Sequence, residues 1–273
     1  MKKLALCAGH YLGTEGRRCL KQYDPNETQE WVLNDRIADR VEKFLAPYDI
    51  EVRRIDDTDG KMYIPLSVRT ATANEWGADF WCGIHHNAGI NGGKGGGITA
   101  YVYTEADAES LDWQAKLYER LIQYSPELRG NRASPLARAN LAECRDTDMP
   151  SVLLELGFMD SSTDVPIIVT EEHTDKCARA IAEVIIEKMG LGFDVPDTGD
   201  GIVWYGGALY TAKEKTSVYQ TSDLKERIGS LFAGETANIV CSVGNAYGIL
   251  YDITKDGLPT GVKKIGFVAR GGG

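Results

Sequence analysis

The sequence predicts an α/β fold, with a twisted, mostly parallel or mixed sheet flanked by helices, and a second, small all-β barrel after it. Three observations support this prediction. Short apolar runs at residues 4–8, 80–84 and 152–154 are typical of buried strands. Apolar stripes at helical spacing lie between these runs, which indicates α/β layering. Beyond a linker-like segment at residues 191–202, the pattern changes to short β-rich runs separated by turn signals.

The first elements follow from the apolar runs and from proline. Asn26 is a candidate N-cap for a helix whose apolar stripe ends before Pro47. Pro65 stands where a helix can begin, because its missing N–H is not needed in the first turn. The expected order is a strand at 4–8, a polar loop at 11–26, a helix with Leu33, Ile37, Val41 and Phe44 on one face, a strand at 50–55 and a helix at 66–76.

The remaining elements complete the α/β unit and begin the barrel. A glycine-rich loop at 89–97 separates two expected strands, at 80–84 and 98–103. The expected later elements are a helix with Leu111, Ala115, Tyr118 and Ile122, a strand around residues 152–158, and a helix with Cys177, Ile181, Val184 and Ile185. The barrel is expected from β-rich runs at 217–219, 237–240, 248–251 and 265–268.

Composition excludes several classes of function. The 273 residues carry a net charge of -10, which argues against nucleic-acid binding because phosphate contacts need a basic face. No apolar stretch approaches the roughly 18 residues of a membrane helix, so we expect no membrane insertion. The apolar run after Met1 is too short for a secretory signal, which predicts accumulation in the cytoplasm. The six cysteines are scattered and are expected to be free thiols.

Three of the apolar runs end near side chains that can bind a metal or move a proton. His10 follows the first run, His85 follows the second, and Glu155 follows the third. Because ligand crevices of open α/β sheets lie outside the carboxyl ends of the strands, these side chains are expected to share one site. A lone histidine after a strand is more often a hydrogen-bonded loop residue. His86 is a rival to His85, since alternation sends the two to opposite faces.

Glu30 is a further candidate ligand. It shares a helix face with Asn34 and Ile37, and a carboxylate on a buried stripe must be paired or bound to a metal. The alternative is that the stripe starts only at Leu33, so that Glu30 lies in a solvated first turn. Glu27 is one turn earlier and competes for the same role. Spacing alone leaves both questions open.

Glu155 lies within an apolar run, which is unusual for a plain surface acid. The alternative is a buried structural acid, paired with Arg69 or Arg145. Two histidines and a glutamate would fill three positions on Zn²⁺ and leave one for water, as in catalytic zinc sites. Glu155 could then move the proton. The spacing itself is of low specificity, because no HExxH pattern is present.

The same residues carry a resemblance to a known family. The chain resembles the zinc-dependent N-acetylmuramoyl-L-alanine amidases of the Amidase_3 family, which cleave peptidoglycan. The resemblance implies Zn²⁺ bound by His10, Glu30 and His85, with Glu155 as the catalytic acid and base, and it favours Glu30 over Glu27 and His85 over His86. The motifs that carry it are Ala8-Gly9-His10, Glu30 with Asn34, Arg69 with Asn74, Gly77-Ala78-Asp79, Ile84-His85-His86-Asn87-Ala88 and Pro150-Ser151-Val152-Leu153-Leu154-Glu155-Leu156-Gly157-Phe158.

The chain departs from the family pattern at a few positions. That pattern is Ser-x-His-x-Asn-Ala around the second histidine. This chain has Gly83 in place of the serine and His86 in place of a usually small residue. It also has Asp160-Ser161 where Ser-Asn is frequent. The His86 change bears on local substrate contacts rather than on the metal.

The C-terminal part resembles a bacterial SH3-like (SH3b) cell-wall-binding domain. The combination resembles a phage or prophage endolysin. It implies a zinc amidase catalytic domain at 1–190, a linker at 191–202 and an SH3-like domain at 203–273, with peptidoglycan as substrate and a cell-wall polymer as partner. Such an enzyme would remain cytoplasmic until lysis. The segments that carry the SH3b likeness are Ile228-Gly229-Ser230-Leu231, Ala233-Gly234-Glu235 and Lys264-Ile265-Gly266-Phe267-Val268.

Three alternatives to the endolysin are open at this point. The first is a zinc peptidase that cuts the peptidoglycan stem peptide, since a zinc-bound water can attack any accessible amide. The second is a host autolysin. The third is a non-catalytic wall-binding protein that keeps the fold, which the four chemically competent site residues disfavour.

Overall fold

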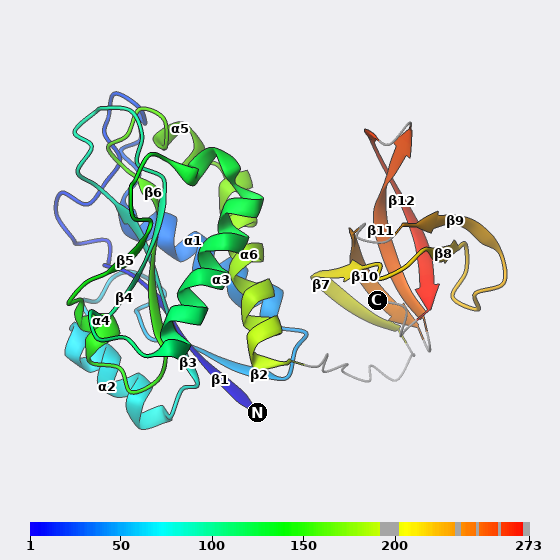
Figure 1. Cartoon of the computed structure of the whole chain (residues 1–273), viewed down its shortest axis with the longest axis horizontal. Coiled ribbons are helices and arrows are strands. Elements are labelled where there is room, and N and C mark those ends of the chain that lie inside the picture. The colour runs from blue at the N-terminus through cyan, green and yellow to red at the C-terminus, as the bar shows by residue number, and fades with distance from the viewer. Residues whose placement is uncertain (192–201, 233–235, 244–245, 256–257, 270–273) are drawn as a thin grey trace. The chain divides into compact units, whose positions relative to one another are not determined.

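A computed structural model describes residues 1–191, 202–232, 236–243, 246–255 and 258–269. The chain divides into two compact units, with the main division between residues 192 and 193 (Figure 1). Within the described residues, all helices belong to the first unit and the second holds only strands. The predicted linker at 191–202 lies outside the described residues except for its two end positions. The proposed domain limits therefore stay predictions.

The sheet of the first unit is mixed. β1, β2, β3 and β6 run parallel, whereas β4 is antiparallel to β6 and parallel to β5. The predicted α/β fold with a mixed sheet is thus confirmed. The strand order is β2-β1-β3-β6-β4-β5. The strands are β1 (Lys2–Ala8), β2 (Ile50–Arg54), β3 (Phe80–Asn87), β4 (Ile98–Val102), β5 (Leu136–Arg138) and β6 (Ser151–Phe158).

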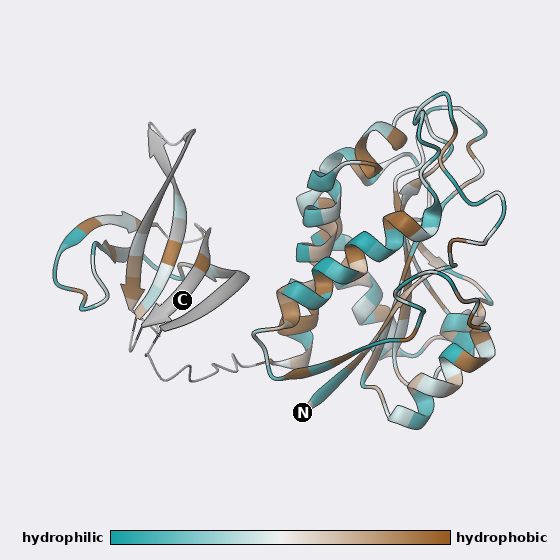
Figure 2. Cartoon of the chain, turned by 180° about the vertical axis from the view of Figure 1, so that it is seen from behind, coloured by the Kyte–Doolittle hydropathy of each residue, from teal (hydrophilic) through white to brown (hydrophobic). Residues whose placement is uncertain are grey.

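Helices cover both faces of this sheet (Figure 1). One face packs against α1 (Glu30–Leu45), α3 (Ala108–Tyr124) and α6 (Glu171–Met189). The other face packs against α2 (Leu66–Trp76) around Trp81 and Ala73. Hydrophilic (teal) and hydrophobic (brown) residues alternate along the long helices in Figure 2, as expected for helices with one buried and one solvated face. The shorter elements are η1 (Pro126–Arg129), α4 (Ala142–Arg145) and α5 (Val165–Ile168).

The strand β1 shows how the two layers form. Leu4 and Leu6 belong to the large cluster under α1, α3 and α6, while Ala5 and Cys7 belong to the cluster under α2. All four are fully buried. Because side chains alternate across a strand, a continuous apolar run is what a strand covered on both faces requires. This packing on both faces fixes the position of the carboxyl end of β1, and His10 lies just beyond that end.

The helix α1 begins later than its predicted N-cap, Asn26. It starts at Glu30, because the preceding segment is held in another conformation. The side chain of Asp24 accepts hydrogen bonds from the N–H groups of Asn26 (3.1 Å) and Thr28 (2.7 Å). The N–H of Glu30 donates to the carbonyl of Arg17 (2.9 Å). Side-chain capture of the backbone therefore competes with helix formation until residue 30.

The predicted start of α2 agrees with the structure. Pro65 precedes Leu66 in an extended conformation, and Gly77 ends the helix at φ 69°. A left-handed residue is a frequent end of a helix, and glycine adopts it without steric cost. Five cysteines with described side chains, Cys7, Cys19, Cys82, Cys144 and Cys177, are free and buried, in line with the expected free thiols. No helix in the described ranges is both long enough and apolar enough to cross a membrane.

The second unit is an antiparallel six-stranded sheet in the order β7-β10-β11-β12-β8-β9. Its core includes Tyr210, Val218 and Ile249. The all-β prediction agrees with this, but an SH3-like barrel stays a prediction, and residues 233–235 of that likeness lie outside the described part. The strands are β7 (Ile202–Thr211), β8 (Thr216–Tyr219), β9 (Arg227–Leu231), β10 (Thr236–Val243), β11 (Ala246–Lys255) and β12 (Leu258–Ala269).

Candidate metal centre

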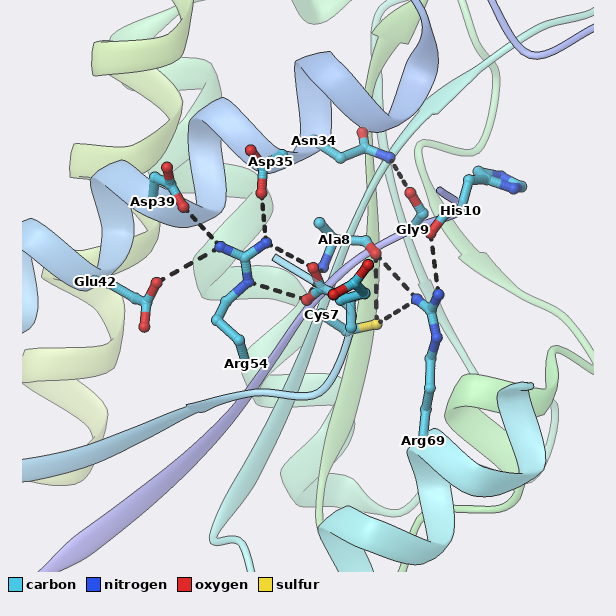
Figure 3. Close-up of polar contacts among 12 residues, drawn as sticks. Cys7, Ala8, Gly9, His10, Asn34, Asp35, Asp39, Glu42, Arg54 and Arg69 are labelled. Atoms are coloured by element: carbon cyan, nitrogen blue, oxygen red, sulfur yellow. Dashed lines mark hydrogen bonds and ion pairs between the residues drawn. The ribbon is translucent and has the colours of Figure 1, made fainter. Parts of the chain in front are cut away.

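The backbone that carries His10 is held in an uncommon conformation. His10 lies two residues beyond the end of β1 and has φ 70°, in the left-handed region that few non-glycine residues adopt. Arg69 donates to the carbonyls of Ala8 and His10, each at 3.0 Å. Asn34 of α1 donates to the carbonyl of Gly9 at 3.1 Å (Figure 3). The surrounding structure thus fixes a strained residue, as is frequent at functional sites.

An ion-pair network centred on the buried Arg54 holds the end of β1. Asp56 accepts a hydrogen bond from the N–H of Ala8 (3.0 Å) and from Arg54 (2.6 Å). Arg54 also donates to Asp35 (2.6 Å) and Asp39 (2.8 Å) of α1 (Figure 3). Burial would lower the pKa of Arg54, but the acids, Asp56 foremost, raise it above its usual value. The charges are paired, as buried charges must be, and they tie β1, β2 and α1 together.

Glu30 lies between His10 and His85. It is the first residue of α1 and is 1% exposed. Its Oε2 is 3.2 Å from Nε2 of His10, and its Oε1 is 3.2 Å from Nδ1 of His85. One potential ligand atom from each residue can be chosen so that all three lie within 4.8 Å of one another. The structure therefore brings together three residues that the sequence placed 20 and 55 positions apart.

Glycine at position 9 permits this close approach. A Cβ atom at Gly9 would lie 2.0 Å from Cε1 of His85, so any larger residue would displace the ring. The N–H of Gly9 donates to the carbonyl of Ile84 (2.9 Å), which aligns the ends of β1 and β3. The motif Ala8-Gly9-His10 thus supplies both a ligand and the room for another ligand.

The rival candidates, Glu27 and His86, lie outside this cluster. Glu27 sits in the loop before α1, and its carboxylate is 3.6 Å from Nζ of Lys21. His86 points to the other face of β3, where its Nδ1 is 2.8 Å from Oδ1 of Asn34. Burial, and then the neighbouring His173, lower the pKa of His86 to about 3, so its ring is neutral. The departure at position 86 therefore concerns the packing of α1 and α6 against β3.

The donors fit a metal ion of the zinc type. Burial alone would raise the pKa of Glu30, but contacts with His10 and His85 outweigh it and hold the pKa well below its usual range. Glu30 is therefore a carboxylate, and its buried Oε2 accepts no well-aligned hydrogen bond within the described structure, although Nε2 of His10 lies 3.2 Å away and Nη1 of the half-exposed Arg17 lies 3.8 Å away. A buried charged oxygen without such a bond is costly unless a cation compensates it. Two imidazole nitrogens and a carboxylate oxygen are ligands that Zn²⁺ prefers.

Glu155 lies beside the cluster on the neighbouring strand. In the β3–β6 pairing it is the direct partner of His85. Its Oε2 is buried and has no hydrogen-bond partner among the described residues. Burial is the largest cause that raises the pKa of Glu155, to about 7. Its proton can therefore be exchanged near neutral pH, which suits a general acid and base.

The structural alternative for Glu155 is not supported. It required an ion pair with Arg69 or Arg145. Arg69 instead donates to backbone carbonyls, and Arg145 pairs with Asp146 at 2.6 Å. Neither arginine bonds to Glu155. Glu155 is thus a half-buried residue next to the cluster, and its buried Oε2 has no hydrogen-bond partner among the described residues.

A second buried acid, Glu143, was not singled out in the sequence. It lies in α4 and is 4% exposed. Its Oε1 is 3.0 Å from Nε2 of His85, and its Oε2 accepts a hydrogen bond from Nε1 of Trp81 (3.3 Å). The sequence signal was weak, because α4 has four residues and shows no periodicity. The one available hint was an acid flanked by apolar residues.

A cavity of about 500 Å³ opens beside the cluster. Arg69 reaches it from α2, and the tilted rings of Tyr11 and Tyr63 lie 5.6 Å apart on its wall. His10, His85 and Glu143 line the same cavity, so a bound molecule would reach the candidate ligands directly. The other lining residues are Thr14, Ile64 and Leu66.

Comparison with known proteins places this site in a family. The sequence profile of Amidase_3, described as N-acetylmuramoyl-L-alanine amidase, matches residues 4–187. The chain belongs to the Amidase_3 family. This match spans the sheet of the first unit except for the first two residues of β1, and it includes all four residues that the resemblance had indicated. The family membership expected from the motifs is thus confirmed.

Relatives of this Amidase_3 chain include bacterial and phage proteins. It is 29% identical over 167 residues to the sporulation-specific N-acetylmuramoyl-L-alanine amidase of Bacillus subtilis (strain 168), which covers 61% of the chain and 62% of the relative. It is 30% identical over 161 residues to the endolysin of Bacillus phage SPP1, which covers 57% and 56%. The chain thus matches about three fifths of the length of these relatives.

Solved structures share the fold of the first unit. An N-acetylmuramoyl-L-alanine amidase from Clostridium difficile 630 superposes with a TM-score of 0.61 at 24% identity, which covers 69% of this chain and 97% of that one. The catalytic domain of CwlV from Bacillus (Paenibacillus) polymyxa var. colistinus gives 0.60 at 21%, covering 70% and 100%. The Amidase_3 unit therefore has the same arrangement of sheet and helices as these enzymes.

Proposed function

We propose that the protein hydrolyses the amide bond between N-acetylmuramic acid and L-alanine in bacterial peptidoglycan. His10, Glu30 and His85 would hold Zn²⁺, and Glu155 would act as the general acid and base. The observation that carries the proposal is the cluster of three ligand groups within 4.8 Å, beside an unpartnered carboxyl group, in a chain of the Amidase_3 family. When bound, Zn²⁺ polarises a carbonyl and lowers the pKa of water.

Glu155 supplies the proton transfers in this proposal. Its carboxylate takes a proton from the attacking water and passes it to the nitrogen of L-alanine as the amide bond breaks. In the chain without metal, burial is the largest cause that raises the pKa of Glu155, to about 7, and a bound cation would lower it, so the carboxylate is ready to accept a proton near neutral pH. Burial keeps it from other partners. The proposal therefore assigns one task to each of His10, Glu30, His85 and Glu155.

The cavity would bind the substrate beside these groups. Its volume, about 500 Å³, lies in the range of small-molecule sites, and the tyrosine pair gives it an apolar wall. Arg69 is occupied by backbone carbonyls and Cys7. We therefore assign Arg69 to holding the His10 backbone and the tyrosines to substrate contact.

The reaction is tested on purified peptidoglycan with the zinc-loaded chain. Mass spectrometry should find intact stem peptides with a free L-alanine amino group, and muramic acid without peptide. Fragments cut within the stem peptide would instead indicate a zinc peptidase. Glu155→Gln is the control, and its digest should lack both products. A wild-type digest without the amide products contradicts the proposal.

We further propose that the protein is an endolysin and that residues 203–273 form an SH3-like domain that binds a cell-wall polymer. The similarity to the phage SPP1 endolysin and the all-β second unit support this. The similarity to the sporulation-specific amidase favours a host autolysin as the second candidate. Expression in a Gram-positive host should lyse the culture only after the membrane is permeabilised. Lysis without that treatment would favour the autolysin.

A further inference from the structure

His85 is enclosed by two acids, one at each ring nitrogen. Its Nδ1 is 3.2 Å from Oε1 of Glu30, and its Nε2 is 3.0 Å from Oε1 of Glu143. A neutral imidazole carries one N–H and one lone pair, so only one nitrogen can bind a metal. Nδ1 is on the side of Glu30, which also contacts His10. The other nitrogen, Nε2, is the one in contact with Glu143.

We propose that Glu143 is a positioning residue that fixes His85 for the metal. Its carboxylate accepts the hydrogen bond of Nε2–H and so leaves the lone pair on Nδ1. This inference rests on the proposed zinc function. Hydrogen bonds of this kind set the tautomer and orientation of a ligating histidine and make it a stronger donor. Glu143 acts through His85 and is not a ligand itself, since the ligand cluster of the described residues does not include it.

The surroundings hold the Glu143 carboxylate in place. Its Oε2 accepts a hydrogen bond from Trp81, a residue of β3 that is fully buried. Trp81, Gly83 and His85 lie on the same face of β3, because every second residue of a strand is on the same side of the sheet. The carboxylate therefore lies along this face and is bonded at both oxygens. A buried acid with both oxygens satisfied has one geometry rather than several.

Gly83 provides the space for this acid. A Cβ atom at position 83 would lie 2.5 Å from Oε2 of Glu143, closer than two such atoms approach. This is the position at which the family pattern has serine and the chain departs from it. The carboxylate of Glu143 therefore occupies the space that a side chain at position 83 would take. The departure at position 83 has a structural reason that the sequence did not reveal.

The test measures zinc binding by the full-length chain rather than its activity. Glu143→Leu removes the acceptor at similar volume, and Glu143→Gln keeps an acceptor oxygen without the charge. Chelator competition should show zinc affinity about 10- to 100-fold weaker in Glu143→Leu, with Glu143→Gln between it and the wild type. Glu155→Gln, which removes a neighbouring buried acid not bonded to His85, should change the affinity much less.

Nitrogen-15 NMR supplies a second readout. In the zinc-loaded wild type the proton of His85 should be on Nε2, and its signal should shift or exchange faster in Glu143→Leu. Should that variant not fold, Gly83→Ala crowds the same carboxylate without removing it and should also weaken zinc binding. Unchanged affinity in the folded Glu143 variants, or a proton on Nδ1, overturns the inference.

Failure of the proposed function gives a different pattern. A wild-type chain that binds Zn²⁺ but releases no amide products would contradict the reaction, while the affinity ratios would still decide the role of Glu143. A wild-type chain that does not bind Zn²⁺ overturns both.

Discussion

At the scale of single residues, Glu155 is the group on which the proposed reaction depends most. Glu155→Gln keeps the size of the side chain but cannot carry the proton. We expect the rate of peptidoglycan hydrolysis to fall about 10²- to 10⁴-fold, with zinc binding and wall binding kept. Release of free amino groups from purified wall measures this. A variant with the wild-type rate would remove Glu155 from the mechanism.

The raised pKa of Glu155 also predicts how the metal-free protein responds to pH. Its pKa is about 7 in the folded state against 4.5 ordinarily, so folding favours the protonated form. This contribution is complete below pH 4.5 and is lost as the pH rises through 7, to a total of about 3 kcal/mol. Against Glu155→Gln, the chelator-treated wild type should therefore become less stable between pH 5 and 8. Parallel pH curves in urea unfolding would contradict the assignment.

Gly9 gives a sharper test of the ligand geometry. Its substitution by alanine places a Cβ atom where the His85 ring lies, 2.0 Å from Cε1. The ring must move away from Glu30, so we expect zinc affinity to fall about 10-fold or more. Gly229→Ala is a suitable control, because its backbone is not left-handed and a Cβ atom there would be in ordinary contact, 3.7 Å from Oη of Tyr251. Equal zinc affinity of Gly9→Ala and the wild type would show that His85 is not held as described.

Sequence reasoning identified the ligand candidates but could not choose among their neighbours. Spacing left Glu27 against Glu30 and His85 against His86 open, because helix starts and strand faces are uncertain by a residue or more. The structure separates them by burial and contact: Glu30 is 1% exposed inside the cluster, whereas Glu27 faces Lys21. Glu143 escaped notice because its role depends on a contact 58 residues away.

At the scale of elements, the segment before α1 determines where Glu30 lies. Asp24→Ala removes the acceptor for the N–H groups of Asn26 and Thr28. We expect a loss of about 1–3 kcal/mol in the free energy of unfolding, since two partly buried hydrogen bonds to a charged acceptor are removed. Zinc affinity should fall too, because Glu30 would lose its fixed position. Denaturant unfolding and chelator competition measure the two effects, and unchanged values in both would contradict this role.

Long periodic elements were predictable, and short ones were not. The helix α2 was located by Pro65 and by its length of 11 residues. The elements α4, α5 and η1 have four residues each and β5 has three, which is too few for a period to show. The direction of β4 was also hidden, because an apolar run looks the same in a parallel and an antiparallel strand.

At the scale of the whole molecule, two units with separate cores predict separable tasks. A chain shortened to residues 1–191 keeps the part of the chain that matches the Amidase_3 family. On soluble muropeptides it should match the full chain. On intact walls it should act about 10-fold more slowly or worse, because under the proposed function the second unit tethers the enzyme to the wall. The assay compares both substrates at equal enzyme concentration. Equal rates on walls would leave the second unit without a role in wall binding.

The buried cysteines have a practical consequence. Desolvation is the main cause that raises the pKa of all five described thiols, which leaves them protonated and shielded from alkylating reagents. They are spread over β1, β3, α4, α6 and the loop at Cys19. Timed alkylation of these five thiols therefore measures the opening of the amidase unit, and their protection within that unit requires no dithiol reductant that would compete for a metal ion.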